Sequence, residues 1–166
     1  SKKIFNELGK RGEVYSWYAA KQNANILIEE GNNKKAIKNL SYAYEKLSRK
    51  TIYEKYDFAT FLKNNDRFDK AVKLYSNIIE NINPKHPLFA KVTDGRGVCY
   101  ERLKKWDKAE KDLLSSLKAE PDQAYVINYL AYSWIEQGVK IKQALKMLEK
   151  ANNLKSNDPF IIDSLG

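Results

Sequence analysis

The chain has little of the chemistry on which metal sites and covalent catalysis depend, because its 166 residues include only one cysteine and one histidine. Cys99 has no second cysteine for an internal disulfide, and Cys99 and His86 could hold a metal ion only with help from carboxylates. His86 stands in a loop between Pro84 and Pro87, where no serine or cysteine lies at a spacing typical of an activated nucleophile. We therefore expect both residues to be structural.

A glycine-rich loop that could cradle a phosphate is also missing. The segment 94–97 contains two glycines, but it falls at the start of an expected helix and does not follow a strand. Catalysis needs convergent groups in a pocket that excludes water, and the sequence shows no such set. It predicts a protein that is not an enzyme, with no cofactor, no metal and no small-molecule substrate.

Long apolar runs are absent as well. The sequence has no stretch of about 18 apolar residues that could cross a membrane, and no short apolar segment behind a basic start as in a secretory signal. A composition of 43% hydrophobic and 31% charged residues is typical of a folded soluble protein. We expect a soluble chain, cytoplasmic or periplasmic, with membrane contact not expected.

Small residues recur in step along the chain and predict its fold. The later small residue of each unit is an alanine, and these alanines are 35, 38 and 35 residues apart: Ala36, Ala71, Ala109 and Ala144. Another small residue precedes each of them by 12 or 13 residues: Ala24, Ala59, Gly97 and Ala131. Apolar residues between these marks follow helical spacing. Each unit is therefore predicted to be two helices whose backbones approach closely at the small residues.

The breaks between the predicted helices carry turn and cap residues. Gly31, Gly138 and the segment 64–66 supply residues that tolerate left-handed dihedral angles or cap a following helix. The chain is expected to reverse direction there, so that each unit is an antiparallel hairpin.

This pattern resembles the tetratricopeptide repeat (TPR), a unit of about 34 residues. The third unit matches best, because Gly97, Tyr100, Ala109, Leu113 and Pro121 fall on the signature positions of the family. The third and fourth units are similar to parts of large bacterial multi-repeat proteins. The resemblance implies an all-α, right-handed α-solenoid of antiparallel helix hairpins that serves as a protein-binding scaffold.

The register divides the chain into four units with partial units at both ends, and the last residues, Leu165 and Gly166, match the start of a fifth repeat. We therefore expect a fragment of a longer array, whose truncated ends could self-associate. The predicted segments are a remnant helix and lead-in over 1–16, repeats over 17–51, 52–89 with an extended loop, 90–123 and 124–157, and a truncated repeat over 158–166.

In stacked hairpins of this kind the first helices line a concave groove, so this register predicts which side chains face a ligand. The candidate groove residues are Tyr18, Lys21, Asn25, Tyr53, Tyr56, Asp57, Lys91, Asp94, Arg102, Tyr125, Asn128, Tyr129 and Tyr132. Tyrosine offers a large contact area and a hydroxyl at little entropic cost, which favours peptide binding. The alternative is that several of these rings pack between hairpins as core.

Some members of the family hold a peptide's terminal carboxylate in a clamp of lysine, asparagine and arginine, and this implies one specific site here. Lys21, Asn25 and Lys91 match that clamp. Asp57 and Gly95 stand where an asparagine and an arginine are required, and an acidic group would repel the carboxylate. The mixed charges of the groove favour a protein or peptide partner over the phosphate backbone of a nucleic acid.

The formal net charge of +9 could indicate nucleic acid, an anionic surface or an acidic partner. Lysines recur at equivalent outward positions of the second helices, with Asp69, Asp107 and Asp112 interleaved among them. The lysines concerned are Lys35, Lys38, Lys70, Lys73, Lys108, Lys111 and Lys146. They are expected to be solubilising charge; the alternative function is an adaptor or spacer that docks an acidic partner or anionic surface through this convex stripe.

Overall fold

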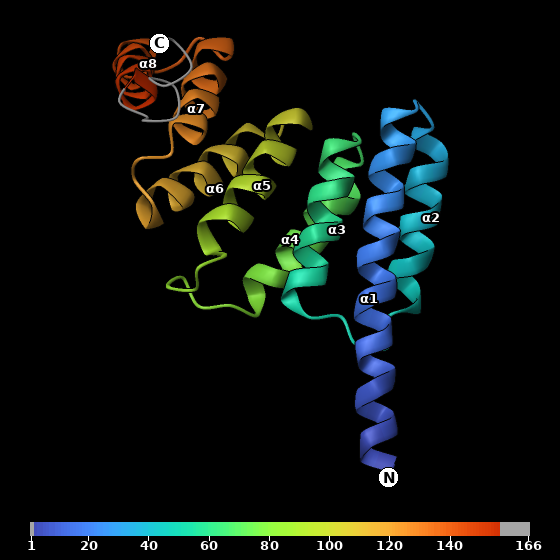
Figure 1. Cartoon of the computed structure of the whole chain (residues 1–166). Coiled ribbons are helices and arrows are strands. Elements are labelled where there is room, and N and C mark those ends of the chain that lie inside the picture. The colour runs from blue at the N-terminus through green and yellow to red at the C-terminus, as the bar shows by residue number, and fades with distance from the viewer. Residues whose placement is uncertain (1, 157–166) are drawn as a thin grey trace. The chain divides into compact units, whose positions relative to one another are not determined.

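The computed structural model describes residues 2–156, with side chains from Gly12 to Lys155. Every regular element in this range is an α-helix (Figure 1). The helices are α1 Lys2–Glu29, α2 Asn33–Lys46, α3 Ile52–Asn64, α4 Phe68–Glu80, α5 Phe89–Arg102, α6 Trp106–Ala119, α7 Ala124–Glu136 and α8 Ile141–Ser156. The predicted all-α class is confirmed, while the truncated repeat predicted over 158–166 lies outside the described residues.

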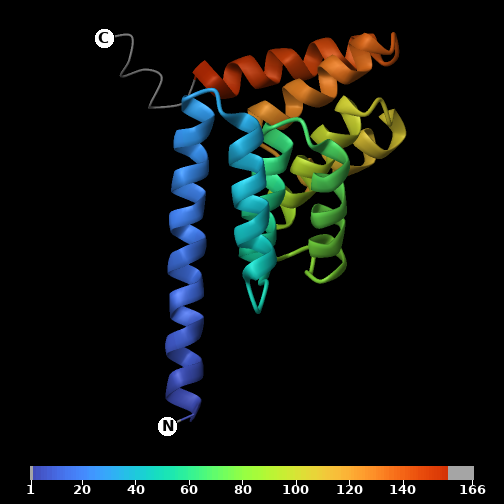
Figure 2. The same ribbon diagram turned by 90° about the vertical axis from the view of Figure 1, so that its right-hand side faces the viewer.

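The chain divides into two compact units, Ser1–Ala71 and Val72–Gly166, and the division falls inside α4. In the first unit α1 packs against α2, and α2 packs against α3. In the second, α5 pairs with α6 and α7 pairs with α8, while α7 also contacts α5 and α6. Figure 2 shows α7 and α8 running side by side.

Helix α1 differs from its predicted form. It runs without a break from Lys2 to Glu29 and so continues through the predicted boundary between residues 16 and 17. Its N-terminal half extends past the end of α2 (Figures 1 and 2). Turn residues follow the prediction more closely, because Gly31, Asp66 and Gly138 all adopt positive φ at helix ends. The division into four repeats with the predicted boundaries stays a prediction.

The repeated small residues lie in the interior of the packed helices. All eight are buried in the structure: Ala24, Ala36, Ala59, Ala71, Gly97, Ala109, Ala131 and Ala144. A Cβ atom at Gly97 on α5 would stand 3.0 Å from Cγ of Leu113 on α6. That separation is tighter than ordinary van der Waals contact, so the spacing of α5 and α6 depends on a residue without a side chain.

Enlarging one of these residues should therefore destabilise its hairpin. Ala109 is fully buried on α6, and we expect Ala109→Leu to lower the free energy of unfolding of the second unit by about 1–3 kcal/mol through overpacking. Urea unfolding followed by circular dichroism measures the change. Ala119→Leu, which makes the same substitution at an exposed position of the same helix, is the control. Equal unfolding midpoints for the two variants would refute this placement of Ala109.

Three aromatic rings form the centre of the first unit. Trp17 on α1 contacts Tyr44 on α2 at a ring-centroid distance of 5.8 Å and Phe58 on α3 at 6.2 Å, while Tyr44 stacks on Phe58 at 4.4 Å. Burial, together with the nearby charge of Glu54, raises the pKa of the Tyr44 phenol to about 12. The cluster joins α1, α2 and α3 through side chains that are neutral at physiological pH.

The core of the second unit combines aliphatic residues with one large aromatic. Its buried members are Val98, Leu113, Val126, Leu130, Ala131, Trp134 and Ala144. Cys99 on α5 is fully buried, as the sequence predicts for a structural thiol. Tyr75 of α4 is buried against α5, where a Cβ atom at Gly95 would lie only 2.6 Å from its ring. Gly95 therefore makes room for Tyr75.

A buried ion pair crosses the second unit, and it corrects one sequence-based prediction. Asp112 was expected among the exposed charges of the second helices, but it is 4% exposed. Its carboxylate accepts two hydrogen bonds from the Arg96 guanidinium, at 2.6 and 2.9 Å, and the same guanidinium donates to Ser76 at 3.0 Å. Burial opposes the Arg96 charge, but the hydrogen bonds and charge of Asp112 raise its pKa overall. The pair ties α4, α5 and α6 together.

Candidate ligand-binding surfaces

A pocket in the second unit, here called the α5–α7 pocket, brings together Arg102 and the four candidate groove residues of the predicted fourth repeat. It has a volume of about 360 Å³. Glu101 and Arg102 from the end of α5 form one wall, and α7 supplies the rest with Tyr125, Asn128, Tyr129, Tyr132 and Ser133. Five of these seven residues were predicted as groove residues. Helical spacing explains the grouping, because residues three and four apart on α7 share one face.

The three tyrosines of this pocket differ in exposure. Tyr132 is 61% exposed and Tyr125 is 48% exposed, while Tyr129 is half-buried between them and α5. The rings of Tyr125 and Tyr129 lie 4.9 Å apart, and Arg102 Nη2 donates a hydrogen bond to the Tyr129 hydroxyl at 3.3 Å. Burial and the charge of Asp94 raise the pKa of Tyr125, so its hydroxyl stays neutral at physiological pH.

The carboxylate of Glu101 is one of two in the second unit, with that of Asp94, that have a buried oxygen without a hydrogen-bond donor among the described residues. Its side chain is 12% exposed, and its Oε2 atom is buried without a hydrogen-bond donor in the described part of the chain. Arg102 Nε approaches that oxygen only to 3.6 Å. By comparison, Glu136 at the end of α7 binds Lys104 Nζ at 2.6 Å. The pocket therefore contains a largely desolvated negative charge with weak compensation.

A smaller pocket, of about 210 Å³, lies in the first unit. Four predicted groove residues line it, namely Lys21, Asn25, Tyr56 and Asp57, together with Leu40, Thr60, Phe61 and Asn64. Lys21 forms an ion pair with Asp57, so the lysine of the implied carboxylate clamp is neutralised by the residue that departs from the clamp pattern. Gly95, the other departure, faces the Tyr75 ring, which leaves no space there for an arginine side chain.

The remaining candidates lie outside these two pockets. Tyr18 and Tyr53 are each 60% exposed in the first unit, and Lys91 is exposed while Asp94 is half-buried in the second. None of the six candidate tyrosines is fully buried, but half-buried Tyr129 also packs against the core of the second unit. A single continuous groove through all thirteen candidates stays a prediction.

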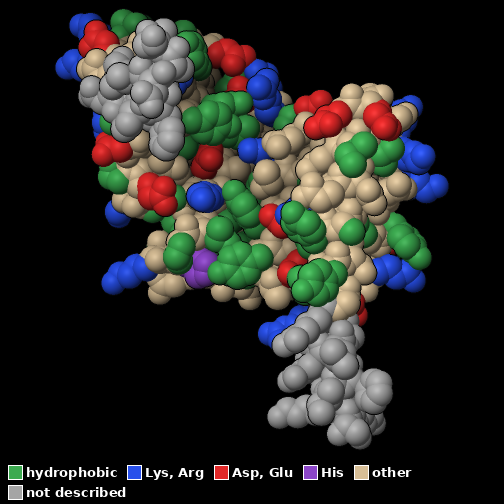
Figure 3. Space-filling view, in the orientation of Figure 1, with side chains coloured by type: hydrophobic (Ala, Val, Ile, Leu, Met, Phe, Trp, Pro, Cys, Tyr) green, Lys and Arg blue, Asp and Glu red, His purple; other side chains and the backbone are tan. Residues whose placement is uncertain are grey.

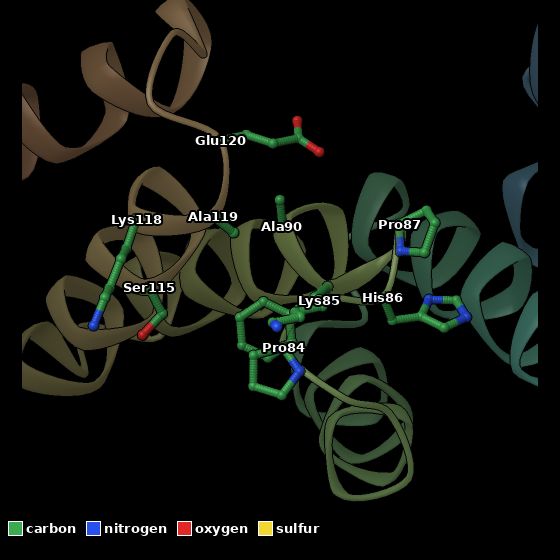
Figure 4. Close-up of a pocket in the computed structure, with 10 residues that line it drawn as sticks. Pro84, Lys85, His86, Pro87, Ala90, Ser115, Lys118, Ala119 and Glu120 are labelled. Atoms are coloured by element: carbon green, nitrogen blue, oxygen red, sulfur yellow. The ribbon is translucent and has the colours of Figure 1, made fainter.

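One cavity was not predicted from the sequence. It has a volume of about 670 Å³ in the second unit, between the loop that precedes α5 and the C-terminal end of α6 (Figure 4). Pro84, Lys85, His86, Pro87 and Phe89 line one side, and Ala90, Ser115, Lys118, Ala119 and Glu120 complete it. The imidazole Nδ1 of His86 accepts a hydrogen bond from the Leu88 N–H at 3.1 Å, which is a structural role. The one sequence feature that could have indicated this cavity is the extended loop at the end of the predicted second repeat.

The lysines of the second helices are all exposed, as predicted: Lys35, Lys38, Lys70, Lys73, Lys108, Lys111 and Lys146. Asp69 and Asp107 are exposed beside them. On the face that Figure 3 shows, acidic and basic side chains are interspersed within each unit. No helix among residues 2–156 is long and apolar enough to cross a membrane. No group of three His, Cys, Asp or Glu side chains in the described part of the chain could hold a metal ion.

Comparisons with known proteins agree with the repeat pattern and the helical pairs. No protein-family model matches the sequence. The TPR repeat-containing protein PA4667 of Pseudomonas aeruginosa is 28% identical over 141 residues, which cover 85% of this chain and 23% of that protein. The chain is similar in sequence and in fold to tetratricopeptide-repeat proteins. It spans less than a quarter of the length of this relative.

Solved structures of TPR-like helical solenoids share the fold of this chain. A MamA structure (MSR-1) superposes with a TM-score of 0.66 at 22% identity, covering 82% of this chain and 75% of that one. A second MamA structure (RS-1) gives 0.68 at 16% identity, covering 94% and 85%. The hetero-tetramer of Cut9 and Hcn1 from the APC/C gives 0.69 at 18% identity, covering 91% and 28%. At these identities the likeness concerns the fold.

Proposed function

We propose that this TPR-like chain is a protein-interaction scaffold and that the α5–α7 pocket binds a peptide segment of its partner. The observation that carries the proposal is the pocket itself. Three tyrosines, an amide, a carboxylate and a guanidinium converge there from two helices. Such a mixture suits a peptide, whose apolar side chains can contact the rings while its backbone and polar groups find hydrogen-bond partners.

The tyrosine geometry supports binding over internal packing. A ring that served only as core would be buried, but Tyr125 and Tyr132 expose about half or more of their surface. Helices α5 and α7 hold these side chains, so a ligand would meet a surface that is already formed and would lose less conformational freedom on binding. Helices α5 and α7 correspond to the predicted first helices of two successive repeats, and such helices are expected to line the groove of this fold.

Replacing the pocket tyrosines tests the proposal. We expect the triple variant Tyr125→Ala, Tyr129→Ala and Tyr132→Ala to lose its partners in a pull-down and to bind a captured partner at least about 30-fold more weakly, because interface tyrosines often contribute about 2 kcal/mol or more each. Tyr15→Ala with Tyr42→Ala, at two exposed positions of α1 and α2, is the control. If the triple variant captured the same partners as the wild type in the pull-down, the pocket would not be the binding site.

A second candidate function is an adaptor that docks an acidic partner or anionic surface through the lysines of the second helices. The exposure of all seven lysines favours it. Binding of that kind falls steeply as salt is raised and survives the tyrosine substitutions. Binding that is lost with the tyrosines but persists at moderate salt would support the pocket instead.

A further inference from the structure

The α5–α7 pocket holds a negative charge that the protein itself compensates poorly. Glu101 lines the pocket with a side chain that is 12% exposed, and its Oε2 atom accepts no hydrogen bond from the described residues. Removing a carboxylate from water costs free energy unless donors or a cation replace the lost hydration. This site can therefore gain from a cation that a ligand brings.

The neighbouring arginine does not fill that role. Arg102 follows Glu101 directly on α5, and adjacent residues on a helix point in different directions. Its Nε stays 3.6 Å from the carboxylate, while its Nη2 hydrogen-bonds to the Tyr129 hydroxyl on the opposite wall. The Arg102 side chain is 55% exposed. It thus lies at the rim and leaves the buried oxygen of Glu101 without a donor.

Three other carboxylates of the second unit have closer partners than Glu101 has. Asp112 accepts a two-bond pair from Arg96, Glu110 binds Lys140, and Glu136 binds Lys104. Asp94 adds a second negative charge on the same helix, close enough to raise the pKa of Tyr125. The rings of Tyr125, Tyr129 and Tyr132 present electron-rich faces that attract cations.

We infer that the α5–α7 pocket selects a peptide segment carrying a lysine or arginine, whose cationic group binds the Glu101 carboxylate while its aliphatic stem packs on the tyrosine rings. This inference rests on the proposed function. It specifies a basic side chain in the partner although the scaffold itself carries a net charge of +9. The Glu101 charge can attract a cation despite the positive net charge of the chain, because solvent and salt screen a largely buried carboxylate much less than they screen the surface lysines.

Selection from a random peptide library displayed on phage tests the inference without a known partner. Against the wild-type chain we expect the selected peptides to share a lysine or arginine. We expect these peptides not to bind a variant in which Tyr129 is replaced with alanine. Against Glu101→Gln, which keeps the size of the side chain and removes its charge, we expect the basic residue to disappear from the selected sequences. Glu136→Gln, an exposed carboxylate on α7, is the matched control and should leave the selection unchanged.

Affinity measurements on one selected peptide then give the size of the contact. By fluorescence polarisation we expect Glu101→Gln, or replacement of the basic residue of the peptide by norleucine, to weaken binding about tenfold or more. The two changes together should weaken it no further, since they remove the same contact. If Glu101→Gln does not fold, the norleucine peptide against the wild-type chain measures the same interaction.

The possible failures are distinguishable. If no selected peptide depends on the pocket tyrosines, the proposed function is wrong and this inference falls with it. If peptides bind through the tyrosines but share an acidic or purely apolar pattern, or bind Glu101→Gln as well as the wild type, the proposed function stands and the basic-residue inference is overturned.

Discussion

Replacing Asp112 with alanine is expected to lower the free energy of unfolding of the second unit by about 3–5 kcal/mol, the largest effect of any charge change considered for this chain. The substitution leaves the half-buried Arg96 guanidinium without the carboxylate that accepts two of its hydrogen bonds. An uncompensated charge in a desolvated site is far more costly than the loss of an exposed ion pair. Urea unfolding followed by circular dichroism measures the loss.

Two further variants distinguish the effect of breaking the buried ion pair from the effect of removing a negative charge from α6. Asp107→Ala removes an exposed carboxylate from the first turn of the same helix, and we expect it to change stability by less than about 1 kcal/mol. Replacing both partners, with Arg96→Met and Asp112→Leu, should recover much of the stability lost in Asp112→Ala, because apolar residues leave no buried charge. Equal losses for Asp107→Ala and Asp112→Ala would contradict the buried pair.

Replacing Trp17 with alanine should have an effect of similar size in the first unit. The indole contacts Tyr44 and Phe58, so its removal leaves a cavity among α1, α2 and α3. Truncating a buried aromatic to alanine typically costs about 3–5 kcal/mol. Thermal unfolding followed by circular dichroism should show a lower midpoint temperature than in the wild type. The fluorescence of the remaining tryptophans, Trp106 and Trp134, reports the unfolding of the second unit separately.

The next residue along the chain provides a matched control for that experiment. Tyr18 is 60% exposed whereas Trp17 is 4% exposed, although both are aromatic and both lie in the middle of α1. We expect Tyr18→Ala to change stability by no more than about 0.5 kcal/mol, as is usual for surface substitutions. A large loss of stability for Tyr18→Ala, or no loss for Trp17→Ala, would show that the rotation of α1 about its axis described here is wrong.

The fold could be predicted from the sequence because the repeat places the same physical requirement in each unit. Backbones that approach closely exclude large side chains, so small residues must recur at the contact points, and residues such as Ala36 and Ala144 record that requirement directly. Turn chemistry is equally local, which is why Gly31 and Gly138 mark the ends of α1 and α7. These signals need no knowledge of which side chains meet in space.

The charge of the second helices could be predicted only in part. Asp107 and Asp112 are both on α6 among lysines, and nothing local to the sequence distinguishes them. Asp112 is buried because Arg96, sixteen residues earlier on another helix, reaches it. Such pairing depends on the rotation of two packed helices about their axes, which the apolar pattern fixes only approximately.

The candidate site shows the same division. The α7 tyrosines could be placed together because helical spacing alone puts Tyr125, Tyr129 and Tyr132 on one face. The poor compensation of Glu101 and the ion pair between Lys21 and Asp57 depend on distances between helices, so they emerge only from the structure. The cavity beside Pro84 likewise follows from the path of a loop, which has no periodicity.

Gly95, which packs against the Tyr75 ring, limits which helices of this array could be exchanged by protein engineering. Gly95 and Tyr129 occupy equivalent positions of successive repeats, each two residues before a buried small residue. In α5 that position is open and receives the ring of a neighbouring helix, whereas in α7 it carries a ring of its own into the pocket. A chimera that copied α7 in place of α5 would set two tyrosines in one space. Successive modules of this chain are therefore not interchangeable, and an engineer who lengthens or shuffles the array must move α4 and α5 together.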